Sequence, residues 1–320
     1  MIYSAIKKAR LLRSMTQAQV AHALGISQPN YQRWESGTSP VPSGKLEKLA
    51  KVLGATVNQI LGKQTPFDIL GNNKSVEDDR TYFGEVTIHF SNGTLPLLLS
   101  LSEEARTNLY RDITDEGGFI CVESLENQMV FIRRSAIADI YFSSDAYDDY
   151  GPEVYEQSLG LLPDDSFWRV VEFSDCLDAI EDDIDKIFID EVISKILLSE
   201  VDLAKLKSSQ DLSDQELNQI KEDADKLNQR FINRAQNISW QLSSGKQRSE
   251  NVNENRLIYD VFGTFKFENL DPIICLPVED YHRTIFINTS VVDYISIPAH
   301  KFRDGEIECL ENEIDRSERK

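Results

Sequence analysis

Long apolar runs and paired cysteines are both absent from the sequence. No apolar stretch approaches the roughly 20 residues that a membrane-spanning helix needs, and the N-terminus lacks the apolar core and cleavage site of a secretory signal. The four cysteines lie far apart and form no Cys-x-x-Cys pair: Cys121, Cys176, Cys275 and Cys309. We therefore expect reduced, mostly buried thiols in a soluble cytoplasmic protein, with neither a disulfide nor a zinc site.

Signatures of common enzymes are missing as well. The chain has no His-Glu-x-x-His, no Gly-x-x-x-x-Gly-Lys phosphate loop and no Gly-x-Gly-x-x-Gly. Its four histidines are not spaced as metal ligands, and the acidic run at 181–185 is typical of a solvated helix face. We expect no catalytic residue, no metal and no cofactor. An enzyme hidden in the C-terminal part stays an alternative, which a deep polar pocket would support.

Charge is distributed unevenly along the chain. Residues 1–64 carry nine lysines and arginines against two acids, a net charge of +7, whereas the whole chain is at −20 and the rest therefore at −27. A polyanion attracts a basic N-terminal part and repels an acidic remainder. The charge pattern therefore favours contact with nucleic acid through the N-terminal part alone.

The first 62 residues predict five short helices. Apolar residues recur at helical spacing in Ile2–Arg13, Gln17–Leu24, Gln28–Ser36, a fourth segment ending at Leu53 and a short fifth one at Val57–Leu61. Thr16 and Ser27 are suited to cap the second and third helices. Gly25 lies between these two helices, where a tight turn needs a residue that tolerates a positive φ.

This arrangement resembles the helix-turn-helix domain of the phage-repressor (Cro/cI, Xre) type. The resemblance covers about residues 4–62 and is carried by Thr16-Gln17, by Ala21 with Gly25 four residues on, by Ile26-Ser27-Gln28 and by Trp34-Glu35-Ser36-Gly37. Members of this family place the third helix in the major groove of DNA. The resemblance therefore implies an all-α domain that binds double-stranded DNA.

The resemblance also implies which residues contact DNA. The residues expected at base edges come from the first turn and outward face of the third helix: Gln28, Asn30, Gln32 and Arg33. Glutamine and asparagine can pair with adenine, and arginine with guanine. Pro29 stands where many members have a polar side chain, so it can offer only an apolar contact, for example to a thymine methyl group. Phosphate contacts are expected from Gln17, Ser27 and Lys45.

Other residues of this domain are expected to be structural. Arg10 and Glu35 match positions that form a partly buried ion pair in several relatives, and Trp34 lies at an inward position of the third helix. Tyr31 faces partly inward and could serve either role. The loop at 39–42 is proline-rich instead of basic, which favours fewer contacts to the DNA backbone there.

Composition divides the chain into four parts. We predict a helix-turn-helix head at 1–62, a linker at 63–80, an acidic α+β body at 81–305 and a charged, frayed tail at 306–320. The fold class is thus multidomain, with an all-α head followed by an α+β body. The head and the body keep these names below.

The sequence of the body predicts strands at both of its ends and helices between them. The first strands are expected at Gly84–Phe90, Leu95–Ser100, Phe119–Ser124, Gln128–Arg133 and Ile137–Phe142. A helix is expected at 175–198, and a capping box at Ser213–Glu216 opens a long helix to about Leu242. The heptad-like apolar seam of the long helix could pack within the chain or on a second subunit.

A faint internal repeat links the two ends of the body. The pattern Phe131-Ile132-x-x-Ser135-x-Ile137 returns as Phe286-Ile287-x-x-Ser290-x-Val292. We interpret it as two related β modules, at about 81–143 and 257–300, each opened by a glycine-led strand at Gly84 or Gly263. Small β modules that pair edge to edge suit dimerisation or ligand holding.

Together these features predict a sequence-specific, double-stranded DNA-binding transcriptional regulator of a bacterium, phage or plasmid. It would act as a repressor and as a homodimer on a two-fold operator. The acidic body would provide the dimer contact and a site for a protein partner or small-molecule effector, without membrane contact. The alternative is an antitoxin- or immunity-type protein whose acidic body binds a basic partner while the head autoregulates its operon.

Overall fold

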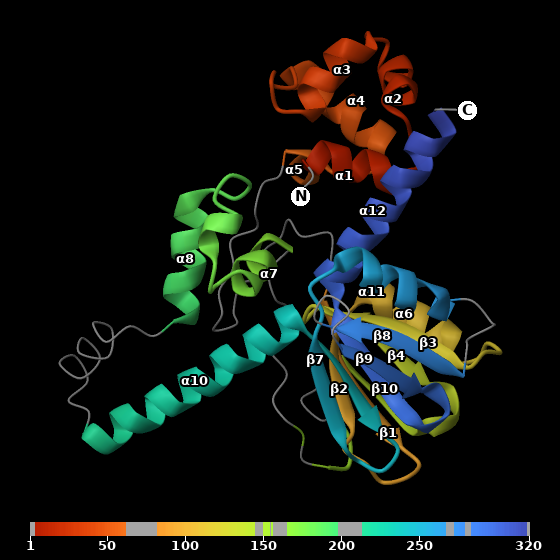
Figure 1. Ribbon diagram of the computed structural model, residues 1–320, viewed down its shortest axis with the longest axis vertical. Coiled ribbons are helices and arrows are strands. Elements are labelled where there is room, and N and C mark those ends of the chain that lie inside the picture. Colours follow the sequence, from red (N-terminus) through yellow and green to blue (C-terminus); the bar gives the residue numbers. More distant parts are fainter. Residues whose placement is uncertain are drawn as a thin grey trace. The chain divides into compact units, whose positions relative to one another are not determined.

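The computed structural model of the 320-residue chain describes residues 4–61, 82–144, 150–153, 155, 165–197, 213–266, 272–278 and 283–318. The chain divides into one unit made of residues 1–64 and 303–320 and a second unit made of residues 65–302. The first unit is helical and the second contains sheets and helices (Figure 1). The predicted fold class, an all-α head and an α+β body, is confirmed. The predicted linker at 63–80 lies outside the described residues.

The helical unit contains the five predicted helices. They are α1 (Ala5–Leu12), α2 (Gln17–Leu24), α3 (Gln28–Glu35), α4 (Ser43–Leu53) and α5 (Val57–Ile60). Their order in sequence places two eight-residue helices, α2 and α3, on either side of a three-residue turn. This is the spacing that the sequence predicts.

Local sequence determines where α2 begins and ends. The Thr16 hydroxyl accepts from the backbone N–H of Gln19, and the Gln19 side chain accepts from the N–H of Thr16, which satisfies two donors that a helix start leaves open. Gly25 ends the helix with φ at +70°. This conformation is unfavourable for any residue that has a Cβ atom, so glycine is the preferred residue here. The short turn from Gly25 to Ser27 then leads into α3, which packs against α2.

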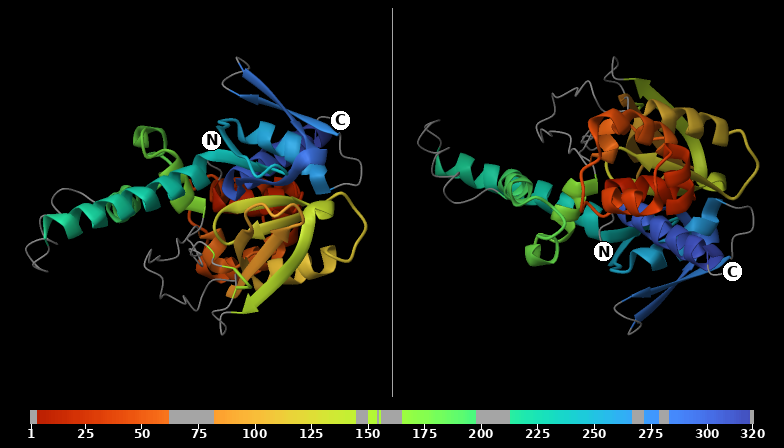
Figure 2. Two further views of the ribbon diagram at one scale, coloured as in Figure 1. Left: turned by 90° about the horizontal axis from the view of Figure 1, so that it is seen from below. Right: turned by 90° about the horizontal axis from the view of Figure 1, so that it is seen from above.

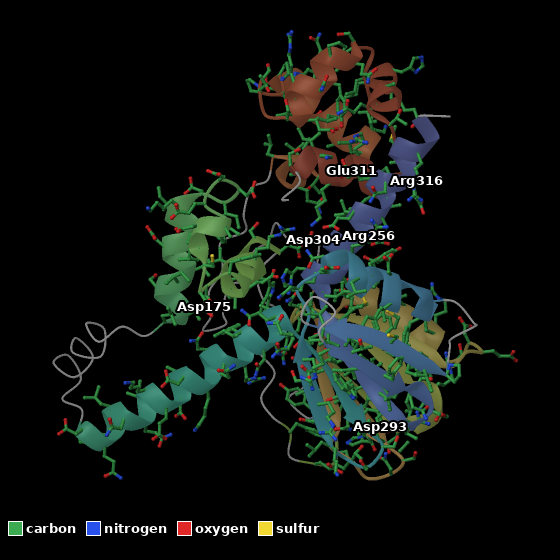
Figure 3. The ribbon with its side chains drawn as sticks, in the orientation of Figure 1. Asp175, Arg256, Asp293, Asp304, Glu311 and Arg316 are labelled. Atoms are coloured by element: carbon green, nitrogen blue, oxygen red, sulfur yellow. The ribbon has the colours of Figure 1, made fainter. Side chains whose placement is uncertain are left out.

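A long C-terminal helix, α12 (Ala299–Glu318), replaces the predicted frayed tail. The prediction for 306–320 is therefore wrong as far as Glu318. Charge explains part of the difference, because Lys7 of α1 forms an ion pair with Glu311 of α12 at 2.5 Å. Figure 3 shows Asp304, Glu311 and Arg316 spaced along this helix. The segment at 303–320 belongs to the same unit as the head.

The body begins with a module of two strands, a helix, two further strands, a 3₁₀ turn and a last strand. They are β1 (Tyr82–Phe90), β2 (Leu97–Ser102), α6 (Glu103–Asp112), β3 (Phe119–Ser124), β4 (Gln128–Arg133), the 3₁₀ turn η1 (Arg134–Ala136) and β5 (Ile137–Ser144). The five predicted strands of this region are present, with bounds that differ by a few residues at most.

The C-terminal module repeats this order of elements. It consists of β6 (Asn237–Leu242), β7 (Gln247–Asn251), α11 (Asn255–Phe262), the turn η3 (Gly263–Lys266), β8 (Ile273–Val278), β9 (Arg283–Asn288), the turn η4 (Thr289–Val291) and β10 (Val292–Pro298). The module thus starts near Asn237, whereas the sequence predicts a start near 257. The expected strand at Gly263 is a 3₁₀ turn that follows a helix.

Detailed geometry supports the duplication. In both modules the strand before the last 3₁₀ turn ends a hairpin, β3–β4 or β8–β9, and the last strand pairs antiparallel with the first, β5 with β1 and β10 with β6. Both last strands carry a register shift, at Ala138 and at Asp293. The N–H of Ser91 donates to Ala136 O and the N–H of Ser243 to Val291 O, each at 2.8 Å. These shared irregularities are harder to obtain by chance than alternation of apolar residues.

The helical insert between the modules differs from its prediction. It contains α7 (Asp165–Glu172), the turn η2 (Leu177–Ala179), α8 (Lys186–Ile196) and α10 (Asp214–Gln236). The expected single helix at 175–198 begins only at Lys186, because the Asp185 carboxylate caps it. The capping box at Ser213 is confirmed, but α10 ends at Gln236 instead of about Leu242, and its last predicted turn is strand β6. Because the insert ends at Gln236, the apolar seam of α10 contains no Ile238.

The strands of the described residues form three sheets. Their orders are β2-β1-β5, β3-β4-β10-β6-β7 and β8-β9. The five-stranded sheet joins the modules, since β4 of the first pairs antiparallel with β10 of the second. The N-terminal core contains Val86, Ile88, Leu99, Leu109 and Ile132, and the C-terminal core contains Trp240, Phe262, Leu276, Ile295 and Phe131. Phe131 thus comes from the first module and packs in the core of the second.

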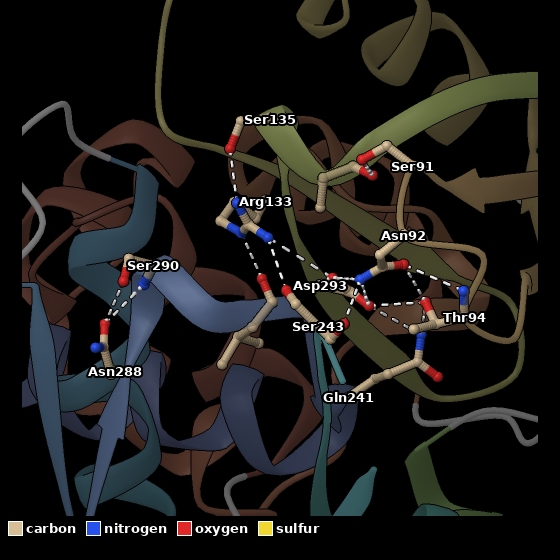
Figure 4. A network of polar contacts seen from close by, with 12 residues as sticks. Ser91, Asn92, Thr94, Arg133, Ser135, Gln241, Ser243, Asn288, Ser290 and Asp293 are labelled. Atoms are coloured by element: carbon tan, nitrogen blue, oxygen red, sulfur yellow. Dashed lines mark hydrogen bonds and ion pairs between the residues drawn. The ribbon is translucent and has the colours of Figure 1, made fainter. Parts of the chain in front are cut away.

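A buried carboxylate also holds the two modules together (Figure 4). Asp293 of β10 is 0% exposed. From the turn after β1, the Asn92 amide donates to both of its oxygens at 3.1 and 3.2 Å and the Thr94 hydroxyl donates at 2.8 Å. Ser243 donates at 2.8 Å from the turn after β6, and the Arg133 guanidinium lies 3.7 Å away.

Two of the four cysteines are exposed. All four cysteines are free thiols, but Cys176 and Cys275 are exposed, so the expectation of mostly buried thiols is wrong. Cys275 faces outward because its neighbours in the strand, Ile274 and Leu276, point into the core. Among the described helices none is long and apolar enough to cross a membrane.

Candidate nucleic-acid interface

Helix α3 presents one exposed polar face. Pro29 and Arg33 are one helical turn apart at the middle of this face, with Gln28, Asn30 and Gln32 beside them, and all five side chains are exposed. The structure thus brings together the five residues predicted to contact bases. Pro29 lies in the first turn, where its missing N–H leaves no helix bond unmade.

The opposite side of α3 anchors it in the head. Tyr31 is fully buried, which resolves its ambiguous position in favour of the core, and Trp34 packs partly buried against the same cluster. Glu35 is buried and accepts two hydrogen bonds from the Arg10 guanidinium, at 2.8 and 2.9 Å. The predicted ion pair of Arg10 and Glu35 is confirmed. It ties α3 to α1, so the exposed face of α3 is held by a rigid element.

Electrostatics favour the charged form of this pair. Burial alone would raise the pKa of Glu35, but hydrogen bonds from Arg10 and from Gln17 outweigh it and hold that pKa below its usual range. Burial and the neighbouring Glu35 carboxylate raise the pKa of Tyr31. The only acid of α3 is therefore neutralised in the interior, and the helix shows DNA no negative side chain.

The residues expected at phosphates lie at the starts of α2, α3 and α4. The Gln17 side-chain amide donates to Glu35 at 2.9 Å, so its backbone N–H at the helix start is the group left for a phosphate. Ser27 is the N-cap residue of α3, as predicted, but its hydroxyl makes no capping hydrogen bond, and its side chain is exposed. Lys45 is half-buried in the first turn of α4.

Lys48 of α4 has a structural role that the sequence does not indicate. Its ammonium group donates to Leu24 O, the carbonyl that ends α2, at 3.2 Å. A lysine at the last carbonyls of a helix stabilises its C-terminus, and here it also joins α4 to the turn before α3. No pattern in the sequence distinguishes Lys48 from Lys45, since only the path of the chain shows which one meets Leu24.

The net charge of the helical unit stays positive. Residues 1–64 carry +7, and the C-terminal segment at 303–320, which belongs to the same unit, carries −3. The unit therefore has a net charge of +4 in a chain of −20. Among residues 1–64 the acids are Glu35, which is paired, and the exposed Glu47 of α4. A positive surface of this kind attracts the phosphate backbone.

Comparison with known proteins agrees with this geometry. A family model described as "Helix-turn-helix" matches residues 6–60, which span α1 to α5. No curated protein and no solved structure matches the chain. The matched family acts in DNA-binding transcription regulation, and the match ends before the body begins. The N-terminal part of this chain is a helix-turn-helix DNA-binding domain of the Cro/cI type.

Proposed function

We propose that the protein is a sequence-specific repressor of transcription that binds a two-fold DNA operator as a homodimer. The observation that carries the proposal is the exposed face of α3, where Arg33 and four further side chains suited to base edges lie together. Among the described residues, no hydrogen bond or ion pair of the Arg33 guanidinium is present, so DNA binding would break none.

Within this proposal each residue has a distinct part. Arg33 would pair with a guanine, and Gln28, Asn30 or Gln32 with adenines, because these side chains match the donor and acceptor patterns of those bases in the major groove. Pro29 would contact a thymine methyl group. The Gln17 N–H, Ser27 and Lys45 would contact phosphates, which positions the helix without selecting a sequence.

The homodimer follows from the small size of the interface. A single α3 reaches few base pairs, whereas two heads on half-sites about 34 Å apart, one turn of DNA, double the number of contacts. A protein that occupies two adjacent major grooves at a promoter also excludes the polymerase, which favours repression. The regulator would act in the cytoplasm of a bacterium or on a phage or plasmid genome.

Selection from a pool of random duplexes tests the specificity directly. The full chain should enrich one motif with two inverted half-sites whose centres lie about 10 base pairs apart. Lys45→Ala should weaken binding to all sequences alike, and Gln32→Ala should relax the preference at one position of each half-site. Enrichment of no motif would contradict a sequence-specific regulator, and enrichment of a single half-site would contradict the dimer.

The body offers a place for an effector. A cavity of about 310 Å³ opens on the five-stranded sheet and the end of α10, and its lining includes Gln128, Arg234, Ser239, Ser249, Tyr294 and Ser296. We propose that a small effector with both polar and apolar groups binds there, since most of the lining side chains carry a hydroxyl or an amide and Trp240, Ile297 and Pro298 add apolar surface. Ser249 is exposed on strand β7, so Ser249→Trp should fill the opening without unfolding the sheet. A ligand that raises the melting temperature of the wild type equally in Ser249→Trp would bind elsewhere.

A further inference from the structure

The two modules differ in one strand pair, although their elements correspond. In the five-stranded sheet, β4 pairs with β10 in the register Phe131 to Ile295. The duplication makes β9 the counterpart of β4 and β5 the counterpart of β10. The equivalent pair would join β9 to β5, yet in the described sheets β5 pairs only with β1 and β9 only with β8.

The hairpins that contain β4 and β9 are built alike. Cys121 lies opposite Phe131 across β3 and β4, and Cys275 lies opposite Phe286 across β8 and β9. Phe131 is 0% exposed because it packs in the core of the other module, whereas its counterpart Phe286 is 70% exposed. The same side chain at the same position of the repeat is thus buried in one module and left outside in the other.

The strand that should receive Phe286 is incompletely covered. Ile295 and Ile297 of β10 are buried, but their counterparts Ile140 and Phe142 of β5 are only partly buried against the N-terminal core. Tyr141, the counterpart of the buried Ser296, is 41% exposed. Among the described residues, β9 thus carries an uncovered apolar side chain and β5 borders an apolar core that is only partly covered, so the two edges are complementary.

We propose that β9 of one copy of the chain pairs with β5 of a second copy and completes its N-terminal core. The register follows from the β4–β10 pair: Ile140 lies opposite Phe286 of the partner subunit, and Tyr141 opposite Ile285 of the partner subunit. Two such pairs, made reciprocally, close a dimer in which both free edges are used. The inference specifies the homodimer of the proposed function, but its contacts do not depend on DNA.

The position of the hairpin favours a second copy over the same chain. Ile274, Leu276 and Ile287 of the β8–β9 hairpin are buried in the C-terminal core, which fixes its inner face. Figure 2 shows β5 in yellow-green and the β8–β9 hairpin in blue on opposite sides of the body in both views. Closing the pair within one chain would require the hairpin to leave that core or to move around it.

Crosslinking between two single variants tests the register. One variant carries Ile140→Cys and the other carries Phe286→Cys. In both chains the exposed cysteines are removed by Cys176→Ser and Cys275→Ser. The two proteins are mixed, unfolded, refolded together and then oxidised. We expect a disulfide-linked dimer that contains one chain of each kind. Tyr141→Cys with Phe286→Cys is the control, since a shift by one residue turns the side chain to the other face of the strand; it should yield little crosslink. Equal yields from both mixtures would overturn the register.

A second variant measures assembly without a crosslink. Phe286→Asp should convert the dimer to a monomer in sedimentation velocity while the circular dichroism of the fold is unchanged, because Phe286 is exposed within the chain. Leu95→Asp is the matched control, as Leu95 is 62% exposed in the β1–β2 turn and should leave the dimer intact. Any of three results would overturn the inference. The wild type could be a monomer at micromolar concentration, the dimer could survive Phe286→Asp, or the crosslink could form inside a chain that carries both cysteines. Specific DNA binding by a dimer that survives Phe286→Asp would overturn this interface alone and leave the proposed function standing.

Discussion

The guanidinium of Arg10 and the carboxylate of Glu35 form a two-point ion pair in the interior of the head, with nitrogen–oxygen distances of 2.8 and 2.9 Å. Glu35 is the last residue of the helix proposed to read DNA, and Arg10 belongs to the first helix of the chain. Both partners are buried, so neither can be removed without leaving a charge away from water. The pair therefore links the orientation of α3 to the stability of the head.

Glu35→Ala should destabilise the head by about 3 to 5 kcal/mol, because it leaves the buried Arg10 guanidinium without its carboxylate. Urea unfolding followed by the fluorescence of Trp34, with contributions of Trp168 and Trp240 subtracted through a Trp34→Phe reference, measures the change. Glu47→Ala is the control, since Glu47 is exposed on α4, and it should change the stability by less than about 1 kcal/mol. Equal effects of the two variants would contradict a stabilising pair.

The pH dependence of the head has a defined sign. The pKa of Glu35 is lowered in the folded state, so its contribution is fully present above the unfolded value of 4.5 and is lost as pH falls through the folded pKa. Stability of the head should therefore decrease on acidification below about pH 4.5, and the decrease should be smaller in Glu35→Gln. A wild type and a Glu35→Gln variant with parallel pH profiles in this window would contradict the assignment.

Asp293 should couple the two modules energetically. In Asp293→Asn, the new NH₂ group faces the donors of Asn92, Thr94 or Gln241, and we expect a loss of about 3 kcal/mol or more. Hydrogen exchange should show faster opening on both sides of the contact, in the β1–β2 and β6–β7 turns. Asp115→Asn, at an exposed acid between α6 and β3, should cost less than about 1 kcal/mol. Faster exchange in one turn alone would contradict a link between modules.

A second buried cluster joins the helical insert to α12. Glu172 of α7 accepts from His300 Nε2 at 2.9 Å and from the Lys301 ammonium at 2.8 Å, and Lys301 is fully buried. Burial would raise the pKa of Glu172, but His300 and Lys301 outweigh it and lower that pKa.

Glu172→Leu should therefore cost about 3 to 5 kcal/mol, and the double variant Glu172→Leu with Lys301→Met should recover much of that loss, because it removes the orphaned charge. Urea unfolding of the single and double variants measures both values. A double variant that is less stable than Glu172→Leu would contradict a charge effect.

The helices of the head could be predicted from the sequence because the residues that determine their ends act locally. The capping box at Thr16, the glycine turn at Gly25 and the proline in the first turn of α3 each act within a few residues. The family resemblance added the pair of Arg10 and Glu35, which are 25 positions apart and show no periodic signal. The exposed face of α3 followed from helical spacing alone.

The elements of the body were harder to predict because the bounds of its helices and strands depend on tertiary pairing. Ile238 and Leu242 are four residues apart, which fits a continuation of α10, and they also alternate with Trp240, which fits a strand. Pairing with β10 decides for the strand. Thr264 to Phe267 alternates like a strand too, but the described part of that segment is a 3₁₀ turn with Phe265 in the core. A partner surface such as Phe286 has no sequence signal at all, since a buried and an exposed phenylalanine look the same.

Binding to the promoter region upstream of its own gene, followed by footprinting over a range of salt concentrations with the wild type and Arg33→Ala, tests the central claim most directly. The account predicts tight, localised protection by the wild type and a loss of about 1 to 3 kcal/mol of binding free energy for each base contact that Arg33→Ala removes. Weak binding that salt abolishes and that Arg33→Ala leaves unchanged would contradict recognition of DNA by α3.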